Sequence, residues 1–217
     1  MLQLRRRSFR AALGLTASVL ATLPTPSVGL AQTSDPAGDF LAGYLGPKGA
    51  DLDVLSAQAF FNGSQFLFTS TQNGPVGTTP NGVFVWGINR GSGTSPGGVF
   101  AANTKFDAVV VFNPAGGSFV RDLPAAISTP LTNVLVGGNT ISGTVDLSLL
   151  PSTGFAATDY EGNLWPRING GPATNIADFA SDTTNFGVTV TPEPGTAVLA
   201  LAGLLAVGVV ARRKRLA

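Results

Sequence analysis

The chain has 217 residues, of which 44% are hydrophobic and only 12% charged, and its net charge is +1. It contains no cysteine and no histidine. This excludes disulfides, thiolate nucleophiles, metal sites with Cys or His ligands, and histidine general bases. A chain this apolar is expected to fold around a core and not to stay disordered.

Charge is distributed unevenly along the chain. Four arginines lie within the first ten residues, and four basic residues occupy positions 212–215. Residues 32–191 carry five basic and eleven acidic side chains. This acidic central region predicts no nucleic-acid binding, because that binding needs Lys and Arg at the phosphates.

Residues 1–31 have the pattern of a secretory signal peptide. A basic start is followed by an apolar run at 11–23, which is too short to span a bilayer. Small residues at Gly29 and Ala31 predict cleavage by signal peptidase between Ala31 and Gln32. The stretch Arg6-Arg7-Ser8-Phe9 also resembles a twin-arginine signal, although its flanking arginines depart from that pattern. The export machinery, Sec or twin-arginine, therefore stays open.

The central region, residues 32–191, is divided by Gly, Asn and Pro into short apolar stretches, which favours strands over helices. The stretches expected to form strands are 52–61, 65–71, 83–88, 106–112, 134–136, 140–147 and 186–190. Asn62-Gly63-Ser64 and Gly137-Gly138-Asn139 predict hairpin turns. Residues 91–98 are expected to form a loop and 174–180 a short helix. About seven to nine short strands predict one all-β domain, a sandwich or a barrel.

The start of this region is rich in aspartate. The stretch of residues 35–40, followed by Asp51-Leu52-Asp53, resembles the opening of carbohydrate-binding-module-like and DOMON-like domains. The resemblance implies a single, jelly-roll-like β-sandwich whose first strand follows an acidic loop.

The aspartates of this opening are candidate calcium ligands, because Ca²⁺ takes six to eight oxygen ligands. They are Asp35, Asp39, Asp51 and Asp53. Two alternatives stay open: they cap turns through nearby backbone amides, or two of them form the carboxylate pair of a glycosidase. No cofactor other than calcium is expected.

The aromatic residues divide between core and surface. Trp86 lies inside an apolar stretch and is expected in the core, whereas residues 160–166 are expected to form a loop. Tyr160 and Trp165 in this loop are candidate ligand-binding residues, since exposed aromatic rings can pack against the apolar faces of sugars.

Residues 150–154 read Leu150-Pro151-Ser152-Thr153-Gly154, the pattern of Gram-positive sortase substrates. That signal needs an apolar helix and a basic end directly after it, and residues 155–160 offer neither. The match therefore predicts no sorting at this position.

The end of the chain combines three features in order. Pro192-Glu193-Pro194-Gly195 precedes an uncharged run at 196–211, and a basic cluster follows at 212–215. As a helix the run is about 24 Å long, enough to enter a thinned bilayer, with its basic end expected in the cytoplasm. This arrangement resembles the PEP-CTERM sorting signal, although Thr191 stands where that family often has Val. The resemblance implies recognition of residues 192–195 by an exosortase, and a tail (192–217) that is removed or exchanged.

Together the two terminal signals predict an exported protein that is held in the inner membrane and then reaches the cell surface or extracellular matrix. The family resemblance implies a Gram-negative host that makes exopolysaccharide. The expected role is a non-enzymatic structural or binding protein of the biofilm. The alternatives are a carbohydrate-binding module and a carboxylate-dependent glycosidase.

Overall fold

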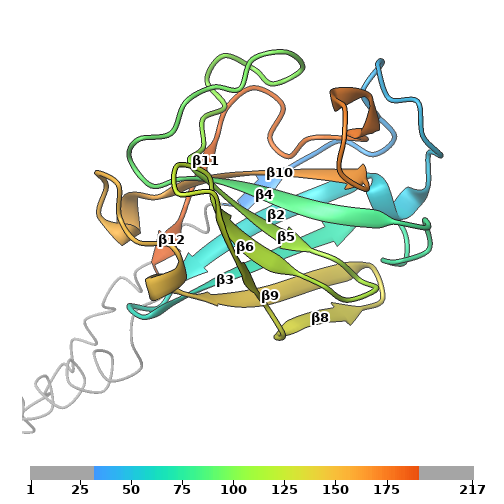
Figure 1. Cartoon of the computed structure of the whole chain (residues 1–217). Coiled ribbons are helices and arrows are strands. Elements are labelled where there is room, and N and C mark those ends of the chain that lie inside the picture. Colours follow the sequence, from blue (N-terminus) through green and yellow to red (C-terminus); the bar gives the residue numbers. More distant parts are fainter. Residues whose placement is uncertain (1–31, 191–217) are drawn as a thin grey trace, which may run out of the picture.

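The structure, a computed structural model, describes residues 32–190, which form strands, loops and four short 3-10 helices. Two sheets face one another (Figure 1), and all their strand pairs are antiparallel except the parallel pair of β12 with β2. The predicted signal peptide (1–31) and the predicted membrane helix (196–211) lie outside the described residues. Within 32–190, no helix has the length and apolar character needed to cross a membrane.

Sheet A has six strands in the spatial order β1-β2-β3-β9-β8, with β12 also pairing with β2. Its strands are β1 (Gln32–Ser34), β2 (Val54–Phe61), β3 (Gln65–Gln72), β8 (Val134–Gly137), β9 (Thr140–Asp146) and β12 (Thr189–Val190). The two predicted hairpin turns are confirmed, because β2 pairs with β3 and β8 with β9 across them. In the first turn the Asn62 side chain accepts hydrogen bonds from the backbone of Ser64 and Gln65.

Sheet B has six strands in the order β11-β10-β4-β5-β6-β7. Its strands are β4 (Gly82–Asn89), β5 (Ala108–Phe112), β6 (Phe119–Asp122), β7 (Ile127–Pro130), β10 (Glu161–Ile168) and β11 (Phe186–Gly187). The 3-10 helices are η1 (Ala50–Leu52), η2 (Leu147–Leu149), η3 (Ala157–Asp159) and η4 (Ala173–Asn175).

The main core lies between the two sheets and contains the inward-facing side chains of both. Trp86 on β4 is fully buried, as predicted, and its ring lies 5.3 Å from Phe68 of sheet A and 6.3 Å from Phe112. Every second residue of β3 and β9 is buried, and these buried side chains form the apolar face of sheet A. One face of each sheet is thus hidden in a shared core.

The strand order corrects the jelly-roll detail of the prediction. Strands β4 to β7 are consecutive in the chain and adjacent in sheet B, so they form a meander. A jelly roll is built from two Greek keys instead. The short connections at 113–118 and 123–126 let β5, β6 and β7 pair in sequence, whereas β4 and β5 pair across the longer loop of residues 90–107.

Two further expectations about elements are wrong. Residues 160–166 were expected to form a loop, but β10 pairs with β4 over its whole length despite its Gly, Asn and Pro. Residues 174–180 form only the short helix η4, because Ala180 and Leu164 exchange backbone hydrogen bonds beside β10. In both cases pairing with a neighbouring strand outweighs local propensity.

A second, smaller core covers part of the outer face of sheet B. Trp165 on β10 packs against Phe100 and Phe106, with ring centroids 4.9 and 5.0 Å apart, and Phe179 lies beside them. These partners come from the loop of residues 90–107 and from the segment after η4. Sheet B is therefore covered on its outer face by loops as well as on its inner face by sheet A.

Candidate cation site and sorting motif

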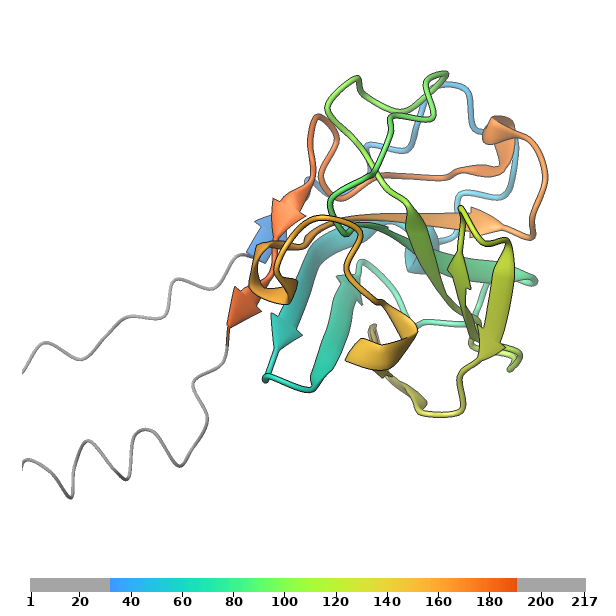
Figure 2. The ribbon, with the colours of Figure 1, turned by 60° about the vertical axis from the view of Figure 1, so that its left-hand side comes forward.

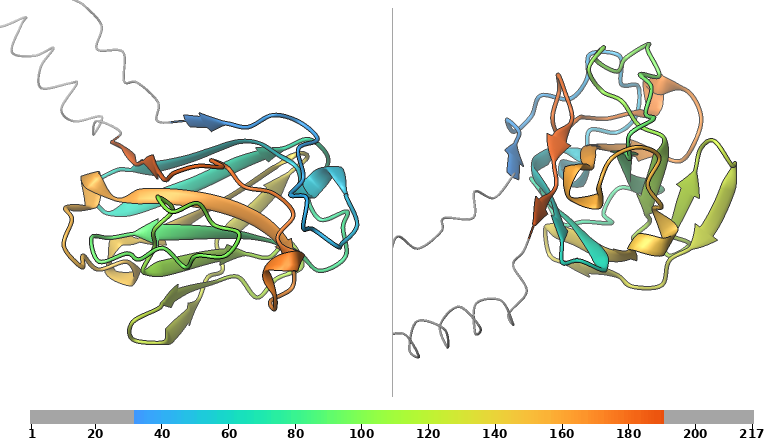
Figure 3. Two further views of the ribbon diagram at one scale, coloured as in Figure 1. Left: turned by 90° about the horizontal axis from the view of Figure 1, so that it is seen from above. Right: turned by 90° about the vertical axis from the view of Figure 1, so that its left-hand side faces the viewer.

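The two ends of the described domain both pair with strand β2. Along β2, Gln32 of β1 pairs with Gln58, and Val190 of β12 pairs with Phe61. Figures 2 and 3 show β1 and β12 on the same side of the molecule. The chain therefore enters and leaves the domain at neighbouring positions.

The other end of β2 carries a cluster of five aspartates, which we call the aspartate cluster. Its members are Asp35, Asp39, Asp53, Asp178 and Asp182. Carboxylate oxygens of Asp35, Asp39 and Asp182 lie within 4.8 Å of one another, and so do those of Asp39, Asp53 and Asp178. Asp39 belongs to both groups and so connects them.

Backbone pairing brings these aspartates together from three chain segments. Asp35 follows β1, and its N–H donates to the Leu55 carbonyl of β2 at 3.0 Å. Asp53 directly precedes β2. Asp178 accepts hydrogen bonds from the N–H groups of Val54 and Phe179 at 2.8 and 2.9 Å, which fixes it at the start of β2.

Asp53 is the deepest of the predicted ligands in the cluster, with only 2% of its surface exposed. Its Oδ2 accepts hydrogen bonds from the Gly38 N–H and the Asn73 side-chain amide, each at 2.9 Å. Its Oδ1 is buried without a hydrogen-bond partner. Asp35 Oδ2 is also buried without one.

The electrostatics of the cluster disfavour its negative charges. Burial, followed by the charges of Asp178 and Asp39, raises the pKa of Asp35 above its usual value. Burial also raises the pKa of Asp178 despite its two backbone hydrogen bonds, and burial together with the Asp39 charge raises the pKa of Asp182. No arginine or lysine within residues 32–190 forms an ion pair with these five carboxylates.

Three of the four predicted calcium ligands therefore lie together, and the fourth does not. Asp51 is fully buried elsewhere, where its carboxylate accepts hydrogen bonds from the N–H and hydroxyl of Thr79. Its role is to hold the loop before β4, as in the turn-capping alternative. Asp51 is not part of the cluster, because Thr79 holds its carboxylate elsewhere.

Sequence reasoning missed Asp178 and Asp182, since about 125 residues separate them from Asp53 and only the fold brings them close. One signal was present in the chain. Asp178 is a lone acid within the apolar run Ile176-Ala177-Asp178-Phe179-Ala180, where a charge is costly unless it has a partner. A buried acid in such a run indicates a specific role.

The expectation that Tyr160 and Trp165 are exposed ligand-binding residues is wrong. Tyr160 is fully buried, donates to the Leu150 carbonyl at 3.0 Å and stacks on Phe66 in the main core. Trp165 is 3% exposed, in the smaller core. Neither ring is an exposed platform, although Trp165 is one of the lining residues of the groove on sheet B described below.

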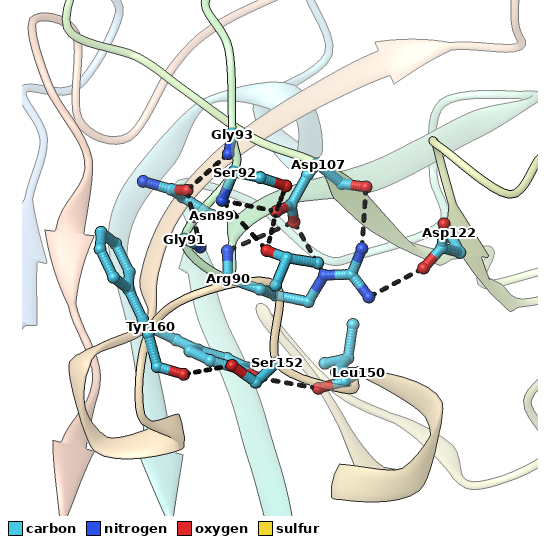
Figure 4. A network of polar contacts seen from close by, with 12 residues as sticks. Asn89, Arg90, Gly91, Ser92, Gly93, Asp107, Asp122, Leu150, Ser152 and Tyr160 are labelled. Atoms are coloured by element: carbon cyan, nitrogen blue, oxygen red, sulfur yellow. Dashed lines mark hydrogen bonds and ion pairs between the residues drawn. The ribbon is translucent and has the colours of Figure 1, made fainter.

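A second polar network surrounds the fully buried Arg90 at the end of β4 (Figure 4). Its guanidinium forms ion pairs with Asp107 at 2.8 Å and Asp122 at 2.9 Å. Burial raises the pKa of Asp107, but the hydrogen bonds from Arg90 and Thr153 and the charge of Arg90 outweigh it. The pKa of Asp107 therefore lies below its usual value, and Arg90 and Asp107 form a charged, buried ion pair.

The sortase-like stretch contributes to this network. The Thr153 hydroxyl donates to Asp107, and the backbone N–H of Thr153 donates to the Arg90 carbonyl. Leu150 is fully buried in the main core. Residues 150–154 thus stabilise the fold by contacts with the Arg90 network and with the main core.

A shallow groove of about 420 Å³ lies on the outer face of sheet B, beside the smaller core. Valines from β4 and β5 line it together with Trp165 and several polar side chains; the lining residues include Val83, Val109, Asn113, Trp165, Arg167 and Asn169. The groove can hold a small or extended ligand with apolar surface.

Comparison with known proteins places the sorting motif at the domain boundary. Residues 190–215 match the family model of the PEP-CTERM protein-sorting motif, and no curated protein matches the chain. The predicted recognition residues 192–195 lie inside the match, although they and Ala31 lie outside the described residues. Gln32 is the first residue of β1. The chain therefore carries a PEP-CTERM sorting signal, the mark of exported proteins that an exosortase sorts at the membrane.

Proposed function

We propose that this protein is a non-enzymatic component of the cell surface or extracellular polysaccharide matrix of a Gram-negative bacterium, released to that site by exosortase processing of its tail. The observation that carries the proposal is the position of the sorting motif. The motif begins at Val190, the last residue of β12, and only Thr191 separates that strand from Pro192. Processing after this point removes no residue of the folded domain.

The chemistry of the domain supports a role without catalysis. The chain has no histidine or cysteine, which are common general bases and nucleophiles. Arg90 holds the carboxylates of Asp107 and Asp122 in ion pairs. The acids considered above for a glycosidase pair lie instead in the aspartate cluster, apart from Asp51, which Thr79 holds. We expect such a domain to act by binding a component of the matrix or as a structural part of it.

The proposal is tested by replacing Pro192, Glu193 and Pro194 with alanine. We expect the variant to accumulate in the membrane fraction with its tail intact, because the exosortase no longer recognises it, while the wild type loses the tail. The readouts are the intact mass and the amount of protein at the cell surface. Alanine replacement of Thr191 is the matched control. Identical processing of the variant and the wild type would refute the proposal.

Glycan binding at the groove of sheet B is a second candidate function. The observation in its favour is a groove lined by valines, by Trp165 and by the polar residues Asn113, Arg167 and Asn169, the mixture of apolar surface and a few polar groups typical of ligand sites. Val109 is half-buried on the outer face of β5, so Val109→Gln is expected to weaken retention on a matrix-polysaccharide affinity gel with little effect on folding. Absence of retention for the wild type on every matrix polysaccharide would rule this candidate out.

A further inference from the structure

The aspartate cluster has a geometry that can accommodate a cation. Two groups of three carboxylate oxygens, each within 4.8 Å, share Asp39 as a common member. Carboxylates this close repel one another, and burial increases the repulsion because water no longer screens it. An arrangement of this kind is stable when a positive charge lies among the oxygens.

The buried end of the cluster gives an independent indication. Only 2% of the surface of Asp53 is exposed. Its carboxylate lies beside those of Asp39 and Asp178, and its Oδ1 has no hydrogen-bond partner. A buried charged oxygen without a partner costs several kcal/mol in a folded protein. The other polar groups around Asp53, the Gly38 N–H and the Asn73 amide, are already used by Oδ2.

We propose that the aspartate cluster binds a calcium ion, with Asp39, Asp53 and Asp178, the group that contains the buried unpartnered oxygen, as its carboxylate ligands. All three ligands are carboxylates, and an all-oxygen set rich in carboxylates selects a hard cation. Ca²⁺ takes six to eight oxygens in a flexible geometry, whereas Mg²⁺ keeps several waters and requires a near-ideal octahedron. Carboxylates from three separate segments of the chain form an irregular set of ligands, which fits Ca²⁺ and not Mg²⁺.

The ion joins three parts of the chain. It connects the segment after β1, the residue before β2 and the segment of residues 176–182 that lies beside β10. It thereby fastens an edge of sheet A to an edge of sheet B. Extracellular calcium modules bind with Kd of about 10⁻⁴–10⁻³ M, so the site fills only after the domain has left the cytoplasm.

The test uses the full chain purified in detergent and freed of metal with EDTA. Addition of roughly 10 mM CaCl₂ is expected to raise the Tm by roughly 5–10 °C, for a Kd on the order of 10⁻⁴ M. Calorimetric titration is expected to show one site per chain. An equal rise with MgCl₂ would indicate general charge screening and would overturn the proposal, as would no rise with CaCl₂.

Asp39→Asn is the decisive variant, because Asp39 is exposed and shared by both groups of carboxylates, so the fold does not depend on it. We expect the calcium-induced rise in Tm to be lost and the Tm in EDTA to stay equal to or above that of the wild type, since one repulsive charge is gone. Asp159→Asn, an equal charge change at an exposed site outside the cluster, is the matched control and keeps the full response. A full calcium response in Asp39→Asn would overturn the ligand assignment.

Discussion

Arg90 shows how a single buried charge is accommodated at the residue scale. Its Nε donates to Asp107 Oδ1 at 2.8 Å, its Nη2 donates to the Asp107 carbonyl at 3.2 Å, and Nη1 pairs with Asp122. These contacts connect the end of β4 with the start of β5 and with β6. Removal of one partner from such a pair leaves an uncompensated charge in the interior.

Arg90→Met is therefore expected to lower the free energy of unfolding by about 3–5 kcal/mol at neutral pH. Asp107 has a lowered pKa in the folded wild type, so its stabilising contribution is complete above the ordinary value of 3.8 and is lost as the pH falls through the folded-state value. The stability difference between wild type and variant should shrink below about pH 4. Urea unfolding over a pH series measures both effects.

Arg121→Met on the same strand as Asp122 is the matched control, since Arg121 is exposed. We expect a change within about 0.5 kcal/mol for this variant. If Arg90→Met were equally mild, or if its effect were independent of pH, the buried ion pair would not stabilise the fold as described.

At the scale of elements, the contact between β4, β10 and the covering loop is tightly packed. A Cβ added at Gly87 of β4 would lie 2.6 Å from Trp165 Cζ3 and 2.8 Å from Phe106 Cδ1. Both rings are held by further aromatic neighbours, so neither can move away freely. Gly87 is thus required by close approach of side chains from two other elements.

Gly87→Ala is expected to destabilise the domain by about 1–3 kcal/mol through overpacking of the smaller core. Gly137→Ala is the comparison, because Gly137 lies in β8 with nothing within 4 Å of its added Cβ. Thermal unfolding of the two variants measures the difference. Equal stability of both variants would show that the loop over sheet B adapts easily to added volume.

Sequence patterns predicted the strands that have a turn sequence or an unbroken apolar run of their own. The Asn-Gly and Gly-Gly turns gave the hairpins β2–β3 and β8–β9, and apolar runs gave β4 and β5. Strand β10 was missed because Gly162, Asn163 and Pro166 break its apolar pattern, and only pairing with β4 makes it a strand. Strand 186–190 was predicted as one element, but it divides at Val188, with β11 in sheet B and β12 in sheet A.

The candidate site was predicted in part for the same reason. Asp35, Asp39 and Asp53 lie close in the chain, so their density in one short stretch indicated a site. Asp178 and Asp182 join them only through contacts between the start of β2 and the segment beside β10. Apart from the lone acid in the apolar run of residues 176–180, long-range contacts of this kind leave no local pattern, and they also account for Tyr160 and Trp165 being buried.

At the scale of the whole molecule, the two ends of β2 contact different functional regions of the protein. At Phe61 the strand pairs with β12, after which the sorting motif continues the chain. Next to Val54, the opposite end adjoins the aspartate cluster, roughly 25 Å away along the strand. Processing of the tail therefore leaves the proposed calcium site untouched, and the two proposals can fail independently.

The central claim is that an exosortase processes this protein directly after its folded domain. Its most direct test is the intact mass of the protein from membranes and from culture medium, in wild-type cells and in cells without exosortase. The account predicts a released form that begins near Gln32 and ends close to Pro192-Glu193-Pro194, and its loss in cells without the enzyme. A full-length tail in every fraction, whether or not exosortase is present, would contradict it.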